Sequence, residues 1–322
     1  MKRIFVLDIF RGLAAISVLL FHYTTKFNSV FKSDLMSAVE FPHGHYGVHL
    51  FFIISGFVIF MTLERLNSGK EFLKRRFIRL YPTFWLCLLI TFSISSLAGI
   101  SQFKRSIIEL FINFTMIPSL LRTKPVDGAY WSLEVELLFY FLMFLIVKMG
   151  RKGDILIFNI FWLIISIFIS YFKIPYLNVL LITDYSYLFI AGISFYKLWS
   201  DSNKISNHFI IVLCLMYGFI IKGVEEGVVV SLFLILFYLF IHGSLEFLRS
   251  FRFLTFFGNI SYPFYLLHQV IGMILIHKLS YFSDNYIVLI IAPFAMITLM
   301  SWLVTKYAEP KLKTIFTKVI KL

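Results

Sequence analysis

The stretch FRGLAAISVLLFHY, residues 10–23, decides the fold class. It has the apolar character of a membrane-spanning helix, yet it carries Arg11 near one end and His22 near the other. A charged or titratable side chain inside a bilayer is costly, so each of the two is a functional hypothesis by default. The rest of the sequence indicates which residues could lie near these two side chains.

Apolar runs of the same kind recur along the 322-residue chain, which is 60% hydrophobic with a mean hydropathy of +0.87. A soluble domain is closer to half apolar, and runs of about 20 residues are long enough to cross a bilayer. We therefore expect an all-α polytopic integral membrane protein with about ten transmembrane helices in one bundle. The expected spans are 4–25, 46–64, 80–100, 129–148, 154–172, 176–198, 206–222, 227–247, 256–278 and 285–308.

Spans of this length, with short loops between them, use nearly the whole chain. We therefore expect a single transmembrane domain over residues 1–322, without a soluble extracytoplasmic domain. Asp8 and Arg11 interrupt the first apolar run, and no small-residue cleavage site follows Tyr23. The first span is therefore expected to stay in the protein and not to be removed as a signal peptide.

The net charge of +13 does not indicate nucleic-acid binding, because its distribution has another explanation. Basic residues gather in alternate loops, with Lys2 and Arg3 at the start and six basic residues from Arg65 to Arg79. This pattern follows the positive-inside rule if both termini lie in the cytoplasm. The charge therefore predicts a topology.

The first span carries a polar stripe. Eleven residues of α-helix make about three turns, so Arg11 and His22 share a face, and Asp8 lies one turn before Arg11. His22 is about 16 Å further along the helix than Arg11. An arginine suits an anionic ligand, and a neutral imidazole suits proton abstraction from a hydroxyl. The alternative is an Asp8–Arg11 pair at the interface and a histidine bonded within a packed core.

A basic segment, FLKRRFIRLYP at residues 72–82, follows the second span. Arg75, Arg76 and Arg79 lie at helical neighbour spacing and predict one cationic face. Such a face could hold the phosphates of coenzyme A or of a lipid diphosphate. The alternative is a topogenic loop that touches anionic lipid headgroups.

The fourth span opens with two carboxylates, in YWSLEVELLFY at residues 130–140. Glu134 and Glu136 lie on different faces, so at most one of them is expected in a shared site. Glu136 would lie about 10 Å from the outer surface, at a depth comparable to that of His22. A carboxylate there could orient the imidazole, or it could form a structural ion pair with another span.

A late span, FFGNISYPFYLLHQ at residues 256–269, combines Pro263 with several polar side chains. The proline predicts a kink that frees backbone carbonyls. His268 either lines a cavity or bonds across helices.

No metal site is expected. The spacing of His43, His45 and His49 matches no compact ligand set. Cys87 and Cys214 lie within separate spans and are expected to pack, without a disulfide.

The chain resembles the membrane-bound acyltransferase family 3, whose members move acyl groups, commonly acetyl, onto cell-envelope carbohydrates. The resemblance covers most of the chain and rests on six strings in the family's order. They are LDIFRGLAAISVLLFH (7–22), GVHLFFIISGF (47–57), FLKRRFIRLYP (72–82), WSLEVELLFY (131–140), GNISYPFYLLH (258–268) and YAEP (307–310).

The resemblance implies a role for several residues. His22 would be the catalytic base with Arg11 as its partner, and Arg76 and Arg79, with Arg75 beside them, would handle the acyl-CoA. Glu136 matches the family's acidic position. Residues that could line the same cavity are Asp8, Ser55, Trp131, Ser132, Glu134, Tyr262, His268 and Glu309.

Two positions depart from the family pattern. His49 stands where the family usually has an acidic residue, and Leu137 replaces a second acid after Glu136. A charge that relatives carry is therefore missing at each place.

The implied function is transfer of an acyl group, most often acetyl, from cytoplasmic acyl-CoA to a hydroxyl of an O-antigen, capsule or other surface polysaccharide. The expected donor is acetyl-CoA or another acyl-CoA. The expected partners are a carbohydrate or lipid-linked saccharide and the bilayer of a bacterial cytoplasmic membrane, with no nucleic acid. The alternative is a transporter or flippase of a lipid-linked saccharide. Direct transfer, an acyl-histidine intermediate and the oligomeric state stay open.

Overall fold

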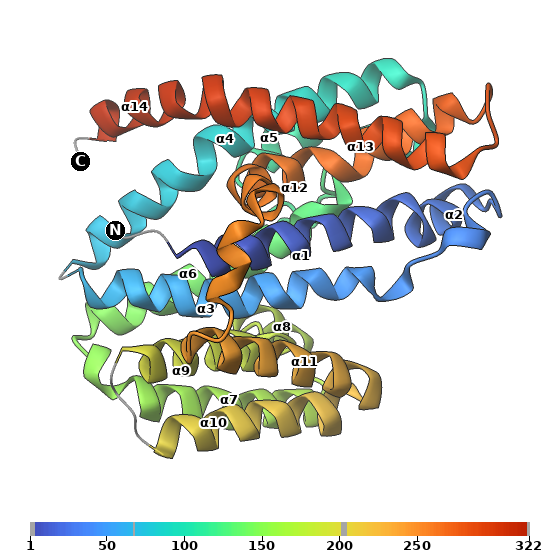
Figure 1. Ribbon diagram of the computed structural model, residues 1–322. Coiled ribbons are helices and arrows are strands. Elements are labelled where there is room, and N and C mark those ends of the chain that lie inside the picture. The colour runs from blue at the N-terminus through green and yellow to red at the C-terminus, as the bar shows by residue number, and fades with distance from the viewer. Residues whose placement is uncertain (1–3, 67, 201–204, 321–322) are drawn as a thin grey trace. The chain divides into compact units, whose positions relative to one another are not determined.

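The computed structural model describes residues 4–66, 68–200 and 205–320, and every regular element in this part of the chain is helical (Figure 1). Lys2 and Arg3 lie outside the described residues. The α-helices are α1 Phe5–Tyr23, α2 Thr25–Phe31, α3 Gly47–Glu64, α4 Gly69–Ala98, α5 Ile107–Asn113, α6 Trp131–Lys148, α7 Ile155–Phe172, α8 Pro175–Leu180, α9 Ser186–Trp199, α10 Ile205–Tyr217, α11 Val224–Ile241, α12 Arg252–Leu279, α13 Tyr286–Leu303 and α14 Glu309–Ile320.

Within the described residues, nine helices are long and apolar enough to cross a membrane, so the chain is an all-α, multi-pass membrane protein. One of the ten expected spans, 176–198, is not a continuous helix in the structure. A turn separates α8 from α9, and Ile182 in that turn has a φ of 46° that no helix allows. α9 therefore has only 14 residues and is about 21 Å long, although most of its side chains are buried by protein.

The contacts within the chain form two compact units. Unit 1 consists of Met1–Leu7, Val48–Leu73 and Val135–Phe251, and unit 2 of Asp8–Gly47, Lys74–Glu134 and Arg252–Leu322. Each unit therefore gathers three separate segments of the chain. The expectation of a single domain stays a prediction.

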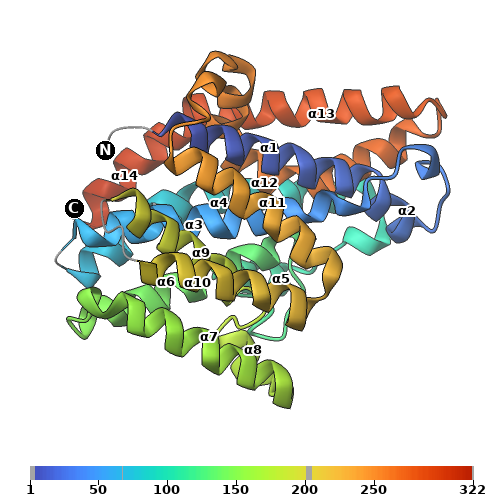
Figure 2. The same cartoon turned by 60° about the horizontal axis from the view of Figure 1, so that its bottom comes forward.

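In unit 1, α9 packs against α7, α10 and α11, and all four helices lie together in Figure 2. Glycines let α3 approach α9 closely. A Cβ atom on Gly192 would lie 2.1 Å from Ile53 O, and one on Gly56 would lie 2.2 Å from Phe189 O. Both distances are too short for any side chain, so the two backbones touch.

In unit 2, α1 and α12 run in the same direction and touch at glycines. A Cβ atom on Gly12 would lie 2.6 Å from Leu254 O, and one on Gly258 would lie 2.0 Å from Asp8 O. Small residues allow helices to approach in this way. α12 continues through Pro263, so the expected kink does not divide the helix.

Candidate active site

The parallel course of α1 and α12 brings two histidines together. His22 lies ten residues after Gly12, and His268 lies ten residues after Gly258, so each is about 15 Å beyond the glycine contact. The two rings lie 4.9 Å apart between centroids, with His22 Nδ1 3.1 Å from His268 Nε2. His268 is buried, whereas His22 is half-buried.

Hydrogen bonds assign the protons on both rings. His268 Nδ1 lies 2.7 Å from Tyr265 O, which only accepts, so Nδ1 carries a proton and Nε2 carries a lone pair. That lone pair faces His22 Nδ1, which also lies 2.8 Å from Val18 O. His22 Nδ1 must therefore donate. In the neutral ring, the basic lone pair of His22 is then on Nε2.

The turn of α12 that carries His268 is held by the segment just before α6. Asp127 Oδ2 accepts from Val270 N at 2.9 Å, and Tyr130 Oη donates to Leu266 O at 3.1 Å. Tyr265 Oη donates to Ala129 O at 3.0 Å. These contacts hold the residues of α12 on both sides of His268 and so fix its position.

Ser132, one of the expected cavity residues, belongs to the same clamp. Its Oγ lies 2.7 Å from Tyr265 Oη and 3.3 Å from Ala129 O. Ser132 thus helps to hold Tyr265, whose carbonyl oxygen accepts the hydrogen bond from His268 Nδ1.

Asp127 was not expected from the sequence. It is fully buried, and its Oδ1 accepts from Ala129 N at 2.8 Å, which caps the short helix Gly128–Tyr130. Burial raises the pKa of the Asp127 carboxyl to about 7. An aspartate directly before a glycine at a helix start is a capping signal that could have identified it.

Two buried polar atoms beside the histidines lack hydrogen-bond partners among the described residues. They are Tyr23 Oη and Gln269 Oε1. The Tyr23 ring lies against the α12 backbone, since a Cβ atom on Gly272 would come within 2.3 Å of its Oη. A buried polar atom without a partner costs free energy, so these two atoms offer hydrogen bonds to a bound molecule.

The cationic candidates also belong to unit 2. Arg11 and Asp8 are half-buried on α1, one turn apart. On α4, Arg76 is buried, Arg79 is half-buried and Arg75 is exposed. The expected arginine face is therefore unequal, because only two of its members are turned into the protein.

Tyr262 fixes α4 near these arginines. Its Oη donates to Leu80 O at 3.0 Å, which ties α12 to the turn after Arg79. Glu309, from the closing YAEP string, forms an ion pair with Lys313 on the same helix. This places Glu309 in a local contact of α14. Trp131 is half-buried at the start of α6.

The two carboxylates of α6 have different tasks. Glu134 Oε1 accepts from Ser119 N at 3.0 Å and so holds a turn of the preceding loop. Glu136 Oε1 accepts from Ser55 Oγ at 2.8 Å and from Tyr140 Oη at 2.5 Å. They face different partners, as their spacing predicts. The expected pairing of Glu136 with His22 stays a prediction.

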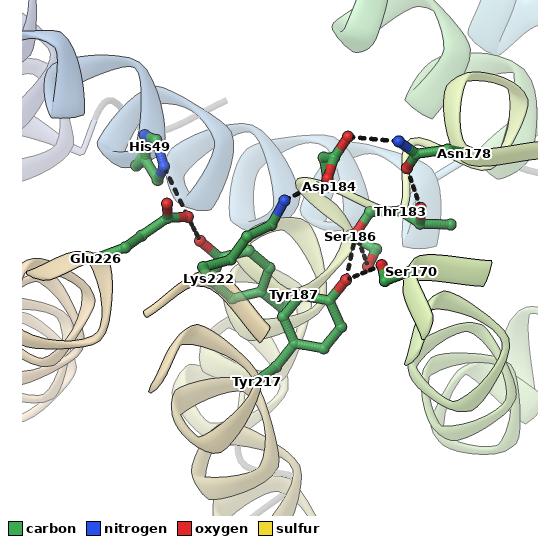
Figure 3. Close-up of polar contacts among 10 residues, drawn as sticks. All are labelled: His49, Ser170, Asn178, Thr183, Asp184, Ser186, Tyr187, Tyr217, Lys222 and Glu226. Carbon is green, nitrogen blue, oxygen red and sulfur yellow. Dashed lines mark hydrogen bonds and ion pairs between the residues drawn. The ribbon is translucent and has the colours of Figure 1, made fainter. Parts of the chain in front are cut away.

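His49 meets a carboxylate from another helix. Its Nε2 lies 3.1 Å from Glu226 Oε1, which also accepts a hydrogen bond from Tyr187 Oη (Figure 3). Position 49 lacks the expected acid, but α11 provides one beside it. Sequence reasoning missed Glu226 because nothing in the sequence relates α3 to α11.

Comparisons with known proteins show which family the chain belongs to. A family model described as an acyltransferase domain matches residues 4–306. Across 82% of each chain, the protein is 26% identical to "Putative acetyltransferase ORF330" of Acidianus two-tailed virus.

Two further relatives match over shorter regions. "Acyltransferase MdmB" of Streptomyces mycarofaciens is 30% identical over 34% of this chain and 30% of its own length. "Exopolysaccharide production protein ExoZ" of Rhizobium meliloti is 31% identical over 31% of this chain and 33% of its own. The chain thus spans about a third of the length of each of these two relatives. No solved structure matches the chain. Since the family model covers nearly all of it, the chain belongs to the acyltransferase family of multi-pass membrane proteins.

Proposed function

We propose that the protein transfers an acyl group, most simply acetyl, from acyl-CoA to a hydroxyl group of a surface polysaccharide. One observation carries the proposal: His22 Nδ1 lies 2.8 Å from Val18 O and 3.1 Å from His268 Nε2. These acceptors hold the proton on Nδ1 and leave Nε2 as a base on a half-buried ring.

The proposed reaction is a direct acyl transfer. His22 Nε2 takes the proton of the acceptor hydroxyl while that oxygen forms a bond to the thioester carbonyl carbon. The carbon–sulfur bond then breaks, and the coenzyme A thiolate takes the proton from Nε2. In between, His22 is an imidazolium whose Nδ1–H donates to His268 Nε2. The neutral His268 therefore stabilises the charge that develops during the reaction.

The arginines are proposed to bind the donor. Arg11, Arg76 and Arg79 belong to the same unit as His22, and Arg76 is turned into the protein. A guanidinium suits phosphate oxygens because it offers several donors in a fixed plane. These residues would hold the phosphates of acyl-CoA. Glu136, which accepts from two hydroxyls, is proposed to have the role that the family's acidic position implies.

Support for a carbohydrate acceptor comes from the relative whose name refers to exopolysaccharide production. The proposed location is a bacterial cytoplasmic membrane with both termini in the cytoplasm. The acyl-CoA would then arrive from the end of α1 that carries Arg11, and the glycan from the end that carries His22.

Transfer from labelled acetyl-CoA in membranes of expressing cells tests the proposal, with native protein and His22→Ala compared at equal expression. We expect label on glycan that mild alkali releases, because O-esters are labile and amides are not. The label should disappear in His22→Ala. Equal labelling by both proteins would refute His22 as the base. No labelling and no thiol release with any acceptor would favour the transporter alternative.

A further inference from the structure

A cavity of about 330 Å³ lies at one end of unit 1, and the proposed acyl transfer assigns no role to it. It lies between the C-terminal end of α7, the short helix α8 and the π-helical turn Gly218–Lys222 that follows α10. Its volume is at the lower end of the range for small-ligand sites. The lining residues divide into an apolar group, Ile169, Ile174, Pro175 and Ile221, and a polar group, Ser170, Lys173, Asn178, Asp184 and Lys222.

The polar group is already ordered. Asn178 Nδ2 donates to Asp184 Oδ2 at 2.7 Å, Asn178 Oδ1 accepts from Thr183 Oγ1, and Lys222 forms an ion pair with Asp184 (Figure 3). A backbone hydrogen bond also joins Thr183 to Asn178, since Thr183 N donates to Asn178 O at 3.0 Å. Side chains that are fixed beforehand lose less entropy when a ligand binds.

Two tyrosines are connected to this polar group. Tyr217 Oη donates to Thr183 O at 3.0 Å and lies 3.0 Å from Ser170 Oγ. The ring of Tyr187 stacks on that of Tyr217 at 4.9 Å and 21°. A connected polar network of this size inside an apolar bundle is costly, and such networks mark functional sites.

The backbone around the cavity adopts uncommon conformations. Ile182 is buried with a φ of 46°, a region that β-branched residues rarely occupy. Lys173 also has a positive φ, 51°, where it ends α7. The π-helical turn that brings Lys222 to Asp184 is itself a rare element that recurs at functional sites. Strain of this kind persists where the surrounding structure and a function maintain it.

The charges around the cavity are unequal. Asp184 balances Lys222, whereas Lys173 is exposed and forms no ion pair with any residue that the structure describes. The cavity therefore carries one positive charge in excess. Its remaining lining residues include the apolar group.

We propose that this cavity binds one sugar unit of the acceptor glycan, and that this unit carries a negative charge as a carboxylate or a phosphate. The apolar wall would contact the C–H face of the ring, while Asn178, Asp184 and Ser170 would bond its hydroxyls. Lys173 would pair with the anionic group. This inference rests on the proposed function and narrows its substrate class to acidic glycans.

Binding of two simple glycosides to the full chain tests the proposal. The protein is placed in nanodiscs of phosphatidylcholine, and methyl β-glucuronide and methyl β-glucoside are titrated by calorimetry without an acyl donor. We expect the glucuronide to bind about fivefold more tightly, as one exposed charge pair allows. Lys173→Gln should remove this preference. Lys148→Gln, a change to an exposed lysine on α6, should keep it.

Other outcomes overturn the proposal. A native protein that shows no preference, or a Lys173→Gln protein that keeps it with an unchanged unfolding midpoint, excludes an anionic sugar at this cavity. Loss of glucuronide binding when phosphatidylglycerol replaces phosphatidylcholine would identify a lipid-headgroup site instead.

The test separates this inference from the proposed function. His22→Ala should bind the glucuronide as the native protein does, because no transfer step is involved. Binding without any acyl transfer would leave the cavity site intact and refute the proposed reaction. Acyl transfer without a preference for the glucuronide would support the proposed reaction and exclude an anionic sugar at this cavity.

Discussion

Two histidines in this protein meet opposite kinds of partner. In unit 2, His22 Nδ1 faces a carbonyl and the lone pair of a second imidazole. In unit 1, His49 Nε2 faces the carboxylate of Glu226, which a tyrosine hydroxyl also contacts. Both rings lie near the ends of long apolar helices, so their positions along the chain look alike.

The partners make the two rings chemically different. An imidazole nitrogen that faces a carboxylate must carry a proton, so it has no lone pair to offer there. His49 Nε2 is therefore a donor that satisfies a charge. His22 donates through Nδ1 to neutral acceptors, so its other nitrogen is left as a base. The contrast teaches that a histidine's partner, more than its place in a helix, decides which of its nitrogens can act as a base.

The largest expected effect is on the rate of acyl transfer, when His22 and His49 are each changed to glutamine. His22→Gln should lower acyl transfer by about 10²- to 10⁴-fold, the range for loss of a general base. His49→Gln should leave the rate per folded molecule unchanged. Rates are measured with labelled acetyl-CoA and normalised to monodisperse protein on size exclusion. Equal losses in the two variants would break the comparison.

A smaller loss is expected at His268, which is proposed to act through His22. His268→Leu removes an acceptor that a charged ring uses, which corresponds to about a 10- to 100-fold drop in kcat without a change in KM. His268→Gln should recover part of the rate, because its Oε1 can accept from His22 Nδ1. If Leu and Gln at this position behave alike, the hydrogen bond has no part in the reaction.

The helix contact behind the pair is tested by stability. Gly258→Ala places a methyl group 2.0 Å from Asp8 O, so α1 and α12 must separate. Overpacking of this kind costs about 1–3 kcal/mol and lowers the unfolding midpoint. Gly153→Ala is the matched control, since no atom lies within 4 Å of the added methyl. Midpoints in detergent should fall only for Gly258→Ala, and a fall in both would contradict a specific contact.

The smallest effect is a change in pH dependence. Burial raises the pKa of Asp127 to about 7, above its ordinary value near 3.9, so the folded protein holds this proton more tightly than the unfolded chain. The stability that this contributes is complete below about pH 4 and is lost as the pH rises through about 7.

Asp127→Asn has no proton to lose at this position. Its unfolding midpoint should therefore decline less than that of the native protein between pH 5 and pH 8. The comparison uses slopes, because the amide also changes the contact with Val270 N by a fixed amount. Parallel profiles would show that Asp127 does not titrate in this interval.

Local patterns of the sequence predicted a large part of this structure. The apolar runs gave the helical membrane fold, since length and hydropathy are properties of each segment alone. The stripe on the first span marked His22 as a candidate, and His22 and His268 both lie in the strings that carry the family resemblance. Their pairing could not be predicted, because it depends on α1 and α12 running in parallel in one register.

Other features were missed for a related reason. Asp127 lies in a loop, where an aspartate is ordinary, and only the fold buries it against α12. The expected span 176–198 failed because hydropathy does not register the left-handed residue Ile182. Glu226 lies 177 residues from His49 along the chain. For Asp127 and Glu226 the deciding contact joins distant segments, whereas for the span 176–198 it is one local backbone conformation.

The separation of 246 residues between His22 and His268 has a consequence for biosynthesis. α1 is made first and α12 near the end, so the first helix enters the membrane long before its partner exists. During that interval the imidazole of His22 has no second ring to accept the hydrogen bond from its Nδ1, and Gly12 faces no neighbouring backbone. Assembly of the histidine pair therefore waits for the last quarter of the chain, and we expect an arrested or truncated polypeptide to transfer no acyl group.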